Sequence, residues 1–167
     1  TKSWIIDGAK ITAAAAADLS ILPGNADKSA LRGIVGVDIK VTGTGVPAEL
    51  KLSFRKEFAG QFANVYKLVD NKLVFQSCAN LSADGSVIKS CAYSSGEYVV
   101  MVCEFSDLPG DMNNDGAINA HDAAAILKDI VGIVKGANPL MSDFNGDGII
   151  NALDASAILK KIVNIAV

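Results

Sequence analysis

The feature that most constrains this chain is an internal repeat in its last third. Residues 111–132 return thirty-two positions later as residues 143–164, and 15 of the 22 aligned positions are identical. Each copy begins with twelve residues rich in Asp, Asn and Gly and continues into an apolar segment with helical periodicity. Each copy is therefore predicted to be a loop followed by one helix.

The polar segment of each copy has the spacing of a calcium-binding loop. Oxygen-bearing side chains occupy positions 1, 3, 5, 9 and 12, glycine occupies position 6, and isoleucine occupies position 8. Ca²⁺ takes about six to eight hard oxygen ligands, and alternating Asp and Asn side chains on a curling loop point toward one centre. We therefore predict two bound Ca²⁺ ions. The predicted ligands are Asp111, Asn113, Asp115, the Ala117 carbonyl, Asn119 through a water, and Asp122 in the first loop, and Asp143, Asn145, Asp147, the Ile149 carbonyl, Asn151 and Asp154 in the second.

Both loops differ from the EF-hand of calcium sensors. They end in Asp at position 12 where such sensors have Glu, and Pro109 and Gly110 precede the first loop, so no helix is expected to lead into it. Asp, Asn and Gly are also common in ordinary polar turns, although an accidental match in two separate loops is not expected. We expect the helices to begin at Asn119 and Asn151, which suit the N-cap position.

Two loop-helix units with Asp at position 12, each followed by Ala-x-Ala-Ile-Leu-Lys-x-Ile-Val, resemble the dockerin module of bacterial polysaccharide-degrading complexes. The resemblance covers residues 110–167. It implies an all-α module of paired EF-hand-like units that binds calcium and docks, without catalysis, on a cohesin domain of a scaffold protein. It also implies that exposed helix positions select the partner. These positions are Ala120, His121, Leu127 and Lys128 in the first copy, and Ala152, Leu153, Leu159 and Lys160 in the second.

His121 and Leu153 occupy the same position of the two copies but differ in chemistry. One pocket on a partner cannot accept an apolar and a titratable side chain equally well, so we predict one preferred docking orientation. The residue types do not decide which copy faces the partner. An ordinary solvated role is the alternative for His121.

Charge and size both predict that the repeat region depends on its metal. Residues 106–167 contain eight Asp, no Glu and four Lys, a formal net charge of −4, and six of these Asp are predicted ligands. Without calcium, these carboxylates repel one another, and a core in a module of this size is small enough that metals are often needed for folding. The apolar stripes of the helices, which include Ile126, Ile130 and Val134 in the first copy and Ile158 and Ile162 in the second, are expected to bury each other.

Residues 1–105 show a different pattern, in which apolar residues alternate as in strands. Asp70-Asn71 and Asp84-Gly85 are tight-turn signals between consecutive segments. Short strands at about ten-residue spacing predict a β-sandwich, so we expect an all-β domain at 1–105 and an all-α domain at 106–167. An all-β domain ahead of a dockerin-like module resembles the X-module arrangement, and this resemblance implies that the sandwich is immunoglobulin-like. Residues 10–30 fit a short helix or a strand, and the predicted strands are 35–41, 50–54, 65–69, 73–75, 86–88 and 98–102.

The three cysteines allow two interpretations. A two-residue turn at Asp84-Gly85 places Cys78 opposite Cys91, close enough for a cross-strand disulfide, whereas a three-residue turn with a bulge places them on opposite faces. Cys103 has no partner in either register. The second turn fits slightly better, so we expect buried free thiols.

Catalysis is not expected, because the chain has one histidine and no nucleophile elbow, P-loop or HExxH motif. Nucleic-acid binding does not fit an isoelectric point of about 5.0. The alternative function is carbohydrate binding by the β-domain, for which Trp4, Tyr66, Tyr93 and Tyr98 are the available aromatic residues other than Phe. The dockerin resemblance implies a secreted protein of an extracellular or cell-surface complex. Thr1 at the start suggests the C-terminal piece of a longer protein.

Overall fold

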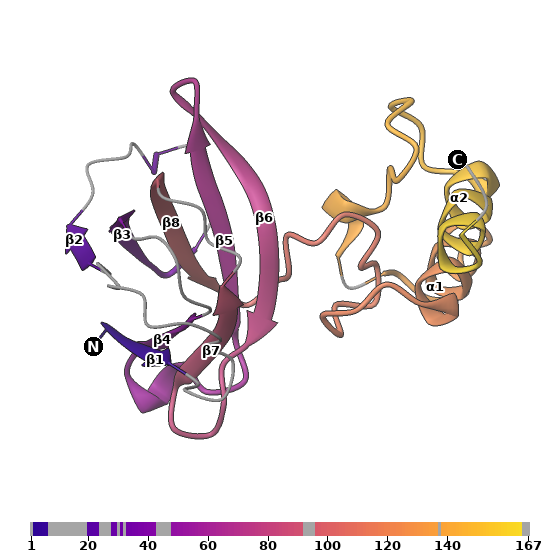
Figure 1. The fold of residues 1–167 in the computed structure, drawn as a ribbon. Helices are drawn as coiled ribbons and strands as arrows, with labels where there is room; N and C mark the ends of the chain where they lie inside the picture. Colours follow the sequence, from indigo (N-terminus) through magenta and orange to yellow (C-terminus); the bar gives the residue numbers. More distant parts are fainter. Residues whose placement is uncertain are drawn as a thin grey trace. The chain divides into compact units, whose positions relative to one another are not determined.

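The computed structural model divides into two compact units, Thr1–Glu104 and Phe105–Val167, which are described separately (Figure 1). The first unit is built from β-strands and the second contains two α-helices, as predicted. No helix in the described part of the chain is long and apolar enough to cross a membrane. The residues described are 2–6, 20–23, 28–29, 31, 33–42, 48–91, 96–136 and 138–164.

The strands described in the first unit form two antiparallel sheets. The smaller sheet has the order β1-β4-β7 and the larger has the order β2-β3-β8-β5-β6. A short 3₁₀ helix, η2 (Lys56–Phe58), follows β4. The strands are β1 (Lys2–Ile6), β2 (Ser20–Pro23), β3 (Val35–Thr42), β4 (Ala48–Ser53), β5 (Phe62–Val69), β6 (Lys72–Asn80), β7 (Ser86–Cys91) and β8 (Gly96–Cys103).

The six predicted strand segments coincide with or overlap β3 to β8, which confirms the alternation pattern as a strand signal. The sequence did not predict β1, and it left open the assignment of β2. Asp70 and Asn71 have φ angles of 49° and 60°, as a tight hairpin turn requires, and they join β5 to β6 (Figure 1). Of the ambiguous stretch 10–30, residues 20–23 form a strand, and most of the others lie outside the described residues.

The predicted hairpin between β6 and β7 is wrong. β6 pairs with β5 in the larger sheet, whereas β7 pairs with β4 in the smaller one. The reason lies in Leu81, which is buried and forms backbone hydrogen bonds with Gly60 and Gln61. These bonds hold the end of β6 beside the residues that precede β5, and from there the chain crosses to the other sheet. Gly85 permits this crossing, because its φ is +76° and a Cβ would lie 2.6 Å from the Arg55 carbonyl oxygen.

This crossing also overturns the cysteine registers. Cys78 lies opposite Asn64 in the larger sheet and Cys91 lies opposite Ala48 in the smaller one, so neither predicted cross-strand arrangement occurs. The side chain of Cys91 lies outside the described residues. Cys103 is a buried free thiol, as expected.

The two sheets share one apolar core. Leu52 of β4 packs in the same cluster as Ile39 of β3, Val65 of β5 and Val100 of β8, and each of these side chains is buried. Burial of alternate residues on facing strands is the arrangement that a two-sheet fold needs. The described part of this unit is therefore mostly β-sheet, as predicted.

The second unit has a small core between its helices. The helices α1 (Ala120–Ile130) and α2 (Ala152–Ile162) are joined by a connection that contains a 3₁₀ helix, η3 (Pro139–Met141). Small residues at the helix contact, Ala123 and Ala155, let the two helices approach closely, and Ile126 and Ile158 are fully buried beside them. Met112 completes the buried cluster.

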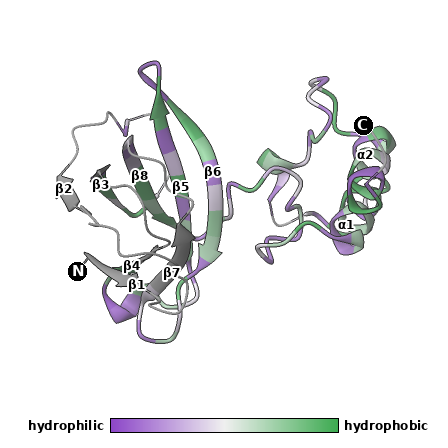
Figure 2. Cartoon of the chain, in the orientation of Figure 1, coloured by the Kyte–Doolittle hydropathy of each residue, from purple (hydrophilic) through white to green (hydrophobic). Residues whose placement is uncertain are grey.

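The prediction that the two apolar stripes bury each other is only partly correct. Ile130 and Ile162 are 46% and 41% exposed, and Val134, which lies beyond the end of α1, is 57% exposed. Each helix has only about three turns, and only the residues that face the other helix are buried. The remaining apolar residues stay on the surface, and Figure 2 shows them beside polar ones along α1 and α2.

Candidate functional site

The start of each helix is fixed by the predicted N-cap residue. Asn119 Oδ1 accepts a hydrogen bond from the His121 backbone N–H at 2.8 Å, and Asn151 Oδ1 accepts one from the Leu153 N–H at 2.7 Å. The Asn119 N–H in turn donates to Asp122 Oδ2 at 2.9 Å, which completes a capping box, and the second copy repeats the pattern. The N-cap prediction is confirmed in both copies.

The Asp at position 12 connects each helix to the beginning of its loop. Asp122 and Asp154 are fully buried. Asp122 Oδ1 accepts from the Asn113 N–H at 3.2 Å, and Asp154 Oδ1 accepts from the Phe144 and Asn145 N–H groups at 2.9 and 3.2 Å. A carboxylate oxygen has more than one lone pair, so these bonds leave room for a metal ligand role. The geometry of the loop and the placement of the helix thus depend on one buried side chain in each copy.

The other polar residues curl each loop around its carboxylates. Asp111 is fully buried and accepts from the backbone N–H groups of Asp115 and Gly116 at 3.0 and 2.9 Å. Gly116 has a φ of +85°, which this sharp turn requires. Asp115 accepts from the Ala117 N–H at 2.9 Å and from Asn113 Nδ2 at 2.8 Å. The predicted first-loop ligands at positions 1, 3, 5, 9 and 12 therefore lie in one hydrogen-bonded cluster.

The second loop repeats this arrangement. Asp143 Oδ2 accepts from the Gly148 N–H at 2.9 Å, and Asp147 accepts from the Ile149 N–H at 2.8 Å and from Asn145 Nδ2 at 2.9 Å. Asn151 Nδ2 donates to the Ile149 carbonyl oxygen at 3.1 Å. Equal spacing in the sequence has produced nearly equal geometry.

The electrostatics of the first loop favour a bound cation. Burial raises the pKa of Asp111 from its ordinary value, even though the Gly116 N–H and the Ser106 side chain act to lower it. For Asp115, partial burial also acts to raise the pKa, but hydrogen bonds from Asn113, Ala117 and Asn119 together outweigh it and lower the pKa. A positive charge close to a buried carboxylate such as Asp111 would favour its ionised form in addition to these hydrogen bonds.

One atom of the second loop fits a metal particularly well. Asp143 Oδ1 is buried and accepts no hydrogen bond from the described residues. Buried polar atoms without a partner are rare in folded proteins, and a bound ion is one explanation for such an atom. Among the described residues, no group of three His, Cys, Asp or Glu side chains is placed to hold a metal ion, so the structure does not bring the three predicted Asp ligands of either loop to one metal position. The predicted sites also include Asn amide and backbone carbonyl oxygens, which are ligands that suit Ca²⁺.

Substitution of Asp143 by Asn should separate metal binding from metal-free stability. The variant keeps the shape of the side chain but removes a charge, so we expect calcium affinity to fall by at least about tenfold, or about 1.4 kcal/mol. Stability without calcium should stay equal or rise, because the buried charged oxygen without a partner is lost. Asp147→Asn is the matched control. Both oxygens of Asp147 accept hydrogen bonds, so replacing one of them by an amide nitrogen should lower metal-free stability. Calorimetric calcium titration measures the loss of affinity, which is expected for both variants because both residues are predicted ligands. The helical signal that remains in chelator reports the metal-free stability; an equal change of this residual signal in the two variants would contradict the assignment.

The eight predicted partner-binding residues all lie on the surface of the second unit. The three leucines among them, Leu153, Leu159 and Leu127, are 62%, 45% and 44% exposed. Exposed leucines on adjacent helices are a feature of surfaces that bind other proteins. Ile130, Val131, Ile162 and Val163 are also exposed, and sequence reasoning missed them because it assigned the apolar stripes to the core. The other five predicted residues, Ala120, His121, Lys128, Ala152 and Lys160, are exposed as well.

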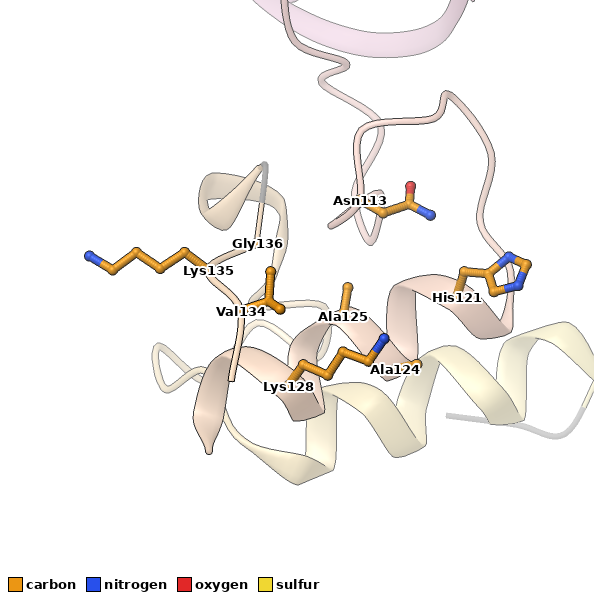
Figure 3. Close-up of a pocket in the computed structure, with 8 residues that line it drawn as sticks. All are labelled: Asn113, His121, Ala124, Ala125, Lys128, Val134, Lys135 and Gly136. Carbon is orange, nitrogen blue, oxygen red and sulfur yellow. The ribbon is translucent and has the colours of Figure 1, made fainter. Parts of the chain in front are cut away.

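A groove of about 340 Å³ lies beside α1 (Figure 3). It includes Asn113 of the first loop, His121 and Lys128 of α1, and the segment 134–136 beyond the helix. Gly136 lets this segment run close to the buried Met112, because a Cβ at this position would lie 1.8 Å from the Met112 Cε. The sequence predicted His121 and Lys128 but missed Val134 and Lys135, which lie outside the helical repeat.

The carbohydrate-binding alternative finds no support among the described aromatic residues. Tyr66 and Tyr98 are 6% and 2% exposed and belong to the core. Tyr93 and the side chain of Trp4 lie outside the described residues. The two described tyrosines therefore do not form an aromatic platform on the surface.

Comparison with known protein families agrees with the geometry of the second unit. The family model of the dockerin type I domain matches residues 109–164, which supports a dockerin module in this part of the chain. Modules of this family are non-catalytic, bind calcium and dock on cohesin domains in general. Comparisons with curated proteins and with solved structures give no match.

Proposed function

We propose that this chain is a calcium-dependent docking module that binds a cohesin domain of a scaffold protein and anchors its parent protein there. The observation that carries the proposal is the repeated coupling of loop and helix. In each copy a buried Asp at position 12 joins the beginning of a polar loop to the first turn of a helix whose outer face is exposed. Metal binding by the loop would then control partner binding by the helix of the same copy, although no calcium-ligating residue needs to touch the partner.

We propose two calcium sites, one in each loop, with the ligands that the spacing predicts. Bound calcium would supply positive charge to each cluster of carboxylates. Asp122 and Asp154 hold the first turns of α1 and α2, so they set where the exposed residues of each helix are presented. Asp111 and Asp143 supply buried carboxylate oxygens from position 1. Together the two loop-helix copies would form a paired EF-hand-like arrangement.

The first unit fits a supporting role in the same proposal. Its two antiparallel sheets with a shared core support an immunoglobulin-like domain of the X-module type. The proposed domain boundary lies between residues 105 and 106, one residue after the division between the two compact units. The parent protein would be secreted and held in an extracellular polysaccharide-degrading complex or on the bacterial cell surface. Catalysis and polysaccharide contact would then belong to other modules of the parent.

Calorimetric titration against a panel of cohesin domains in calcium tests the docking role. We expect one-to-one binding to at least one member of the panel. Substitution of Leu127, Leu153 or Leu159 by Ala should identify the helix that faces the partner, because truncation of a buried interface leucine weakens binding, whereas truncation of a solvent-exposed one does not. Binding to no cohesin, by a chain that holds two calcium ions, would contradict the docking role and leave a calcium-stabilised structural module.

A further inference from the structure

We propose that the groove beside α1 receives an acidic side chain, Asp or Glu, of the docked cohesin, and that the module therefore docks with its first copy toward the partner. This inference rests on the proposed function and adds the chemistry of the contact and its orientation. Both were left open by the sequence, in which the two copies offer similar helices.

The charge of the groove is the first argument. Two lysines, Lys128 on α1 and Lys135 beyond it, line the groove, and none of its lining residues is acidic. Neither ammonium group forms an ion pair with a described residue. His121 also lines the groove, but it interacts electrostatically with Asp115 of the first loop, so the two lysines define the positive charge.

The shape of the groove is the second argument. Its apolar lining is provided by Ala124, Ala125 and Val134. Figure 3 shows Lys128 reaching along α1, while the side chain of Lys135 points outward from the segment 134–136 that forms the other wall. An Asp or Glu side chain has a short apolar stem and a charged end, which matches an apolar floor with one lysine along it and a second lysine at its rim. The volume of about 340 Å³ admits a side chain of this size. Attraction between charged groups of two partners mainly selects the partner and its orientation.

The second copy lacks this combination, which is the third argument. The residue thirty-two positions after Lys128 is Lys160, but His121 corresponds to Leu153 and Lys135 corresponds to Val167. At the positions that line the groove, the second copy therefore has one lysine where the first has two. A further lysine of α2, Lys161, corresponds to Asp129 and lies over the Phe144 ring at 5.1 Å. An acidic side chain on the partner would thus distinguish the two copies by the position of their lysines.

Charge reversal in the two copies tests this inference. We expect Lys128→Glu and Lys135→Glu each to weaken binding of a cohesin by about tenfold or more, because each places a negative charge beside the partner's carboxylate. Lys160→Glu is the matched control at the equivalent position of the second copy and should change affinity by less than about twofold. The full chain is used, with calcium present. All three side chains are exposed, so helical content and calcium binding, measured by circular dichroism and calorimetry, should stay unchanged.

A reciprocal substitution identifies the occupant. An Asp→Lys or Glu→Lys substitution on the docking face of the cohesin should restore affinity to Lys135→Glu, while it weakens binding of the unsubstituted chain. If no such substitution restores binding, the occupant is not an acidic side chain and the inference is wrong. A dimer of this chain that Lys135→Glu dissociates would assign the groove to a second copy.

The remaining outcomes separate this inference from the proposed function. If the unsubstituted chain binds a cohesin but Lys160→Glu weakens binding as much as Lys128→Glu does, docking holds and the assigned orientation is overturned. The orientation is likewise overturned if Lys135→Glu has no effect on cohesin affinity. If the unsubstituted chain binds no cohesin at all, the proposed function itself fails.

Discussion

Removal of calcium should unfold the C-terminal unit while the N-terminal unit keeps its fold. The buried core between α1 and α2 consists of five residues, Met112, Ala123, Ile126, Ala155 and Ile158, three of which are large. Such a core contributes little stabilisation. Each calcium ion adds about 2.7 kcal/mol when its concentration is 100 times its dissociation constant. Without the ions, Asp111 and Asp143 keep buried carboxylate oxygens that lack a compensating charge.

Far-ultraviolet circular dichroism with calcium and with chelator measures this effect. We expect the helical signal at about 222 nm to fall strongly in chelator and to return when calcium is added back. Fluorescence of Trp4, the only tryptophan of the chain, reports on the first unit separately and should change little. Equal helical signal and equal melting temperature in both conditions would show that the metal does not stabilise this unit.

Substitution of both position-12 residues, Asp122→Ala with Asp154→Ala, should unfold the C-terminal unit even in saturating calcium. Asp122 accepts hydrogen bonds from two backbone N–H groups and Asp154 accepts them from three, and both side chains are fully buried. A buried N–H without an acceptor costs about 1–3 kcal/mol, so the loss reaches several kcal/mol and exceeds what a unit of this size can lose. Loss of a predicted ligand from each loop adds to it.

Thermal melts and cohesin titration measure the consequence of this double substitution. We expect no cooperative helical transition and a loss of cohesin affinity of more than about 100-fold, or about 2.7 kcal/mol. Asp129→Ala is the control, because Asp129 is a half-buried residue of α1 outside both loops. It should change stability by less than about 1 kcal/mol. A double variant that stays folded and docks with unchanged affinity at low calcium would show that these residues do not couple the loops to the helices.

Local features of both units could be predicted from the sequence. The N-caps at Asn119 and Asn151 and the turn at Asp70-Asn71 were predicted correctly, because each depends on residues only a few positions apart. The alternation of apolar residues likewise identified β3 to β8 as strands, because a strand with one face on the core has apolar residues at every second position.

Features that depend on distant residues could not be predicted in this way. The pairing of β7 with β4 is decided by the buried Leu81 and its bonds to Gly60 and Gln61, and a turn signal at Asp84-Gly85 contains no information about them. The exposure of Ile130 and Val134 was missed for a related reason. Their apolar character fits a core, but the other helix is too small to cover them.

The groove beside α1 combines both kinds of feature. Its helical wall, with Lys128, was predicted as part of the docking face. Its second wall is the segment 134–136, which is held in place where Gly136 passes close to Met112. These two residues lie far apart in the chain. Geometry of this kind comes only from the folded structure.

The most direct test of calcium-dependent docking is titration of the tightest-binding cohesin into the calcium-depleted chain, followed by the same titration after calcium is restored. We predict no measurable heat of binding in the first titration and one-to-one binding in the second, because the loops place the docking helices only when their carboxylates are neutralised. Equal affinity in both titrations would contradict the account, since docking would then proceed without the two calcium loops on which it is built.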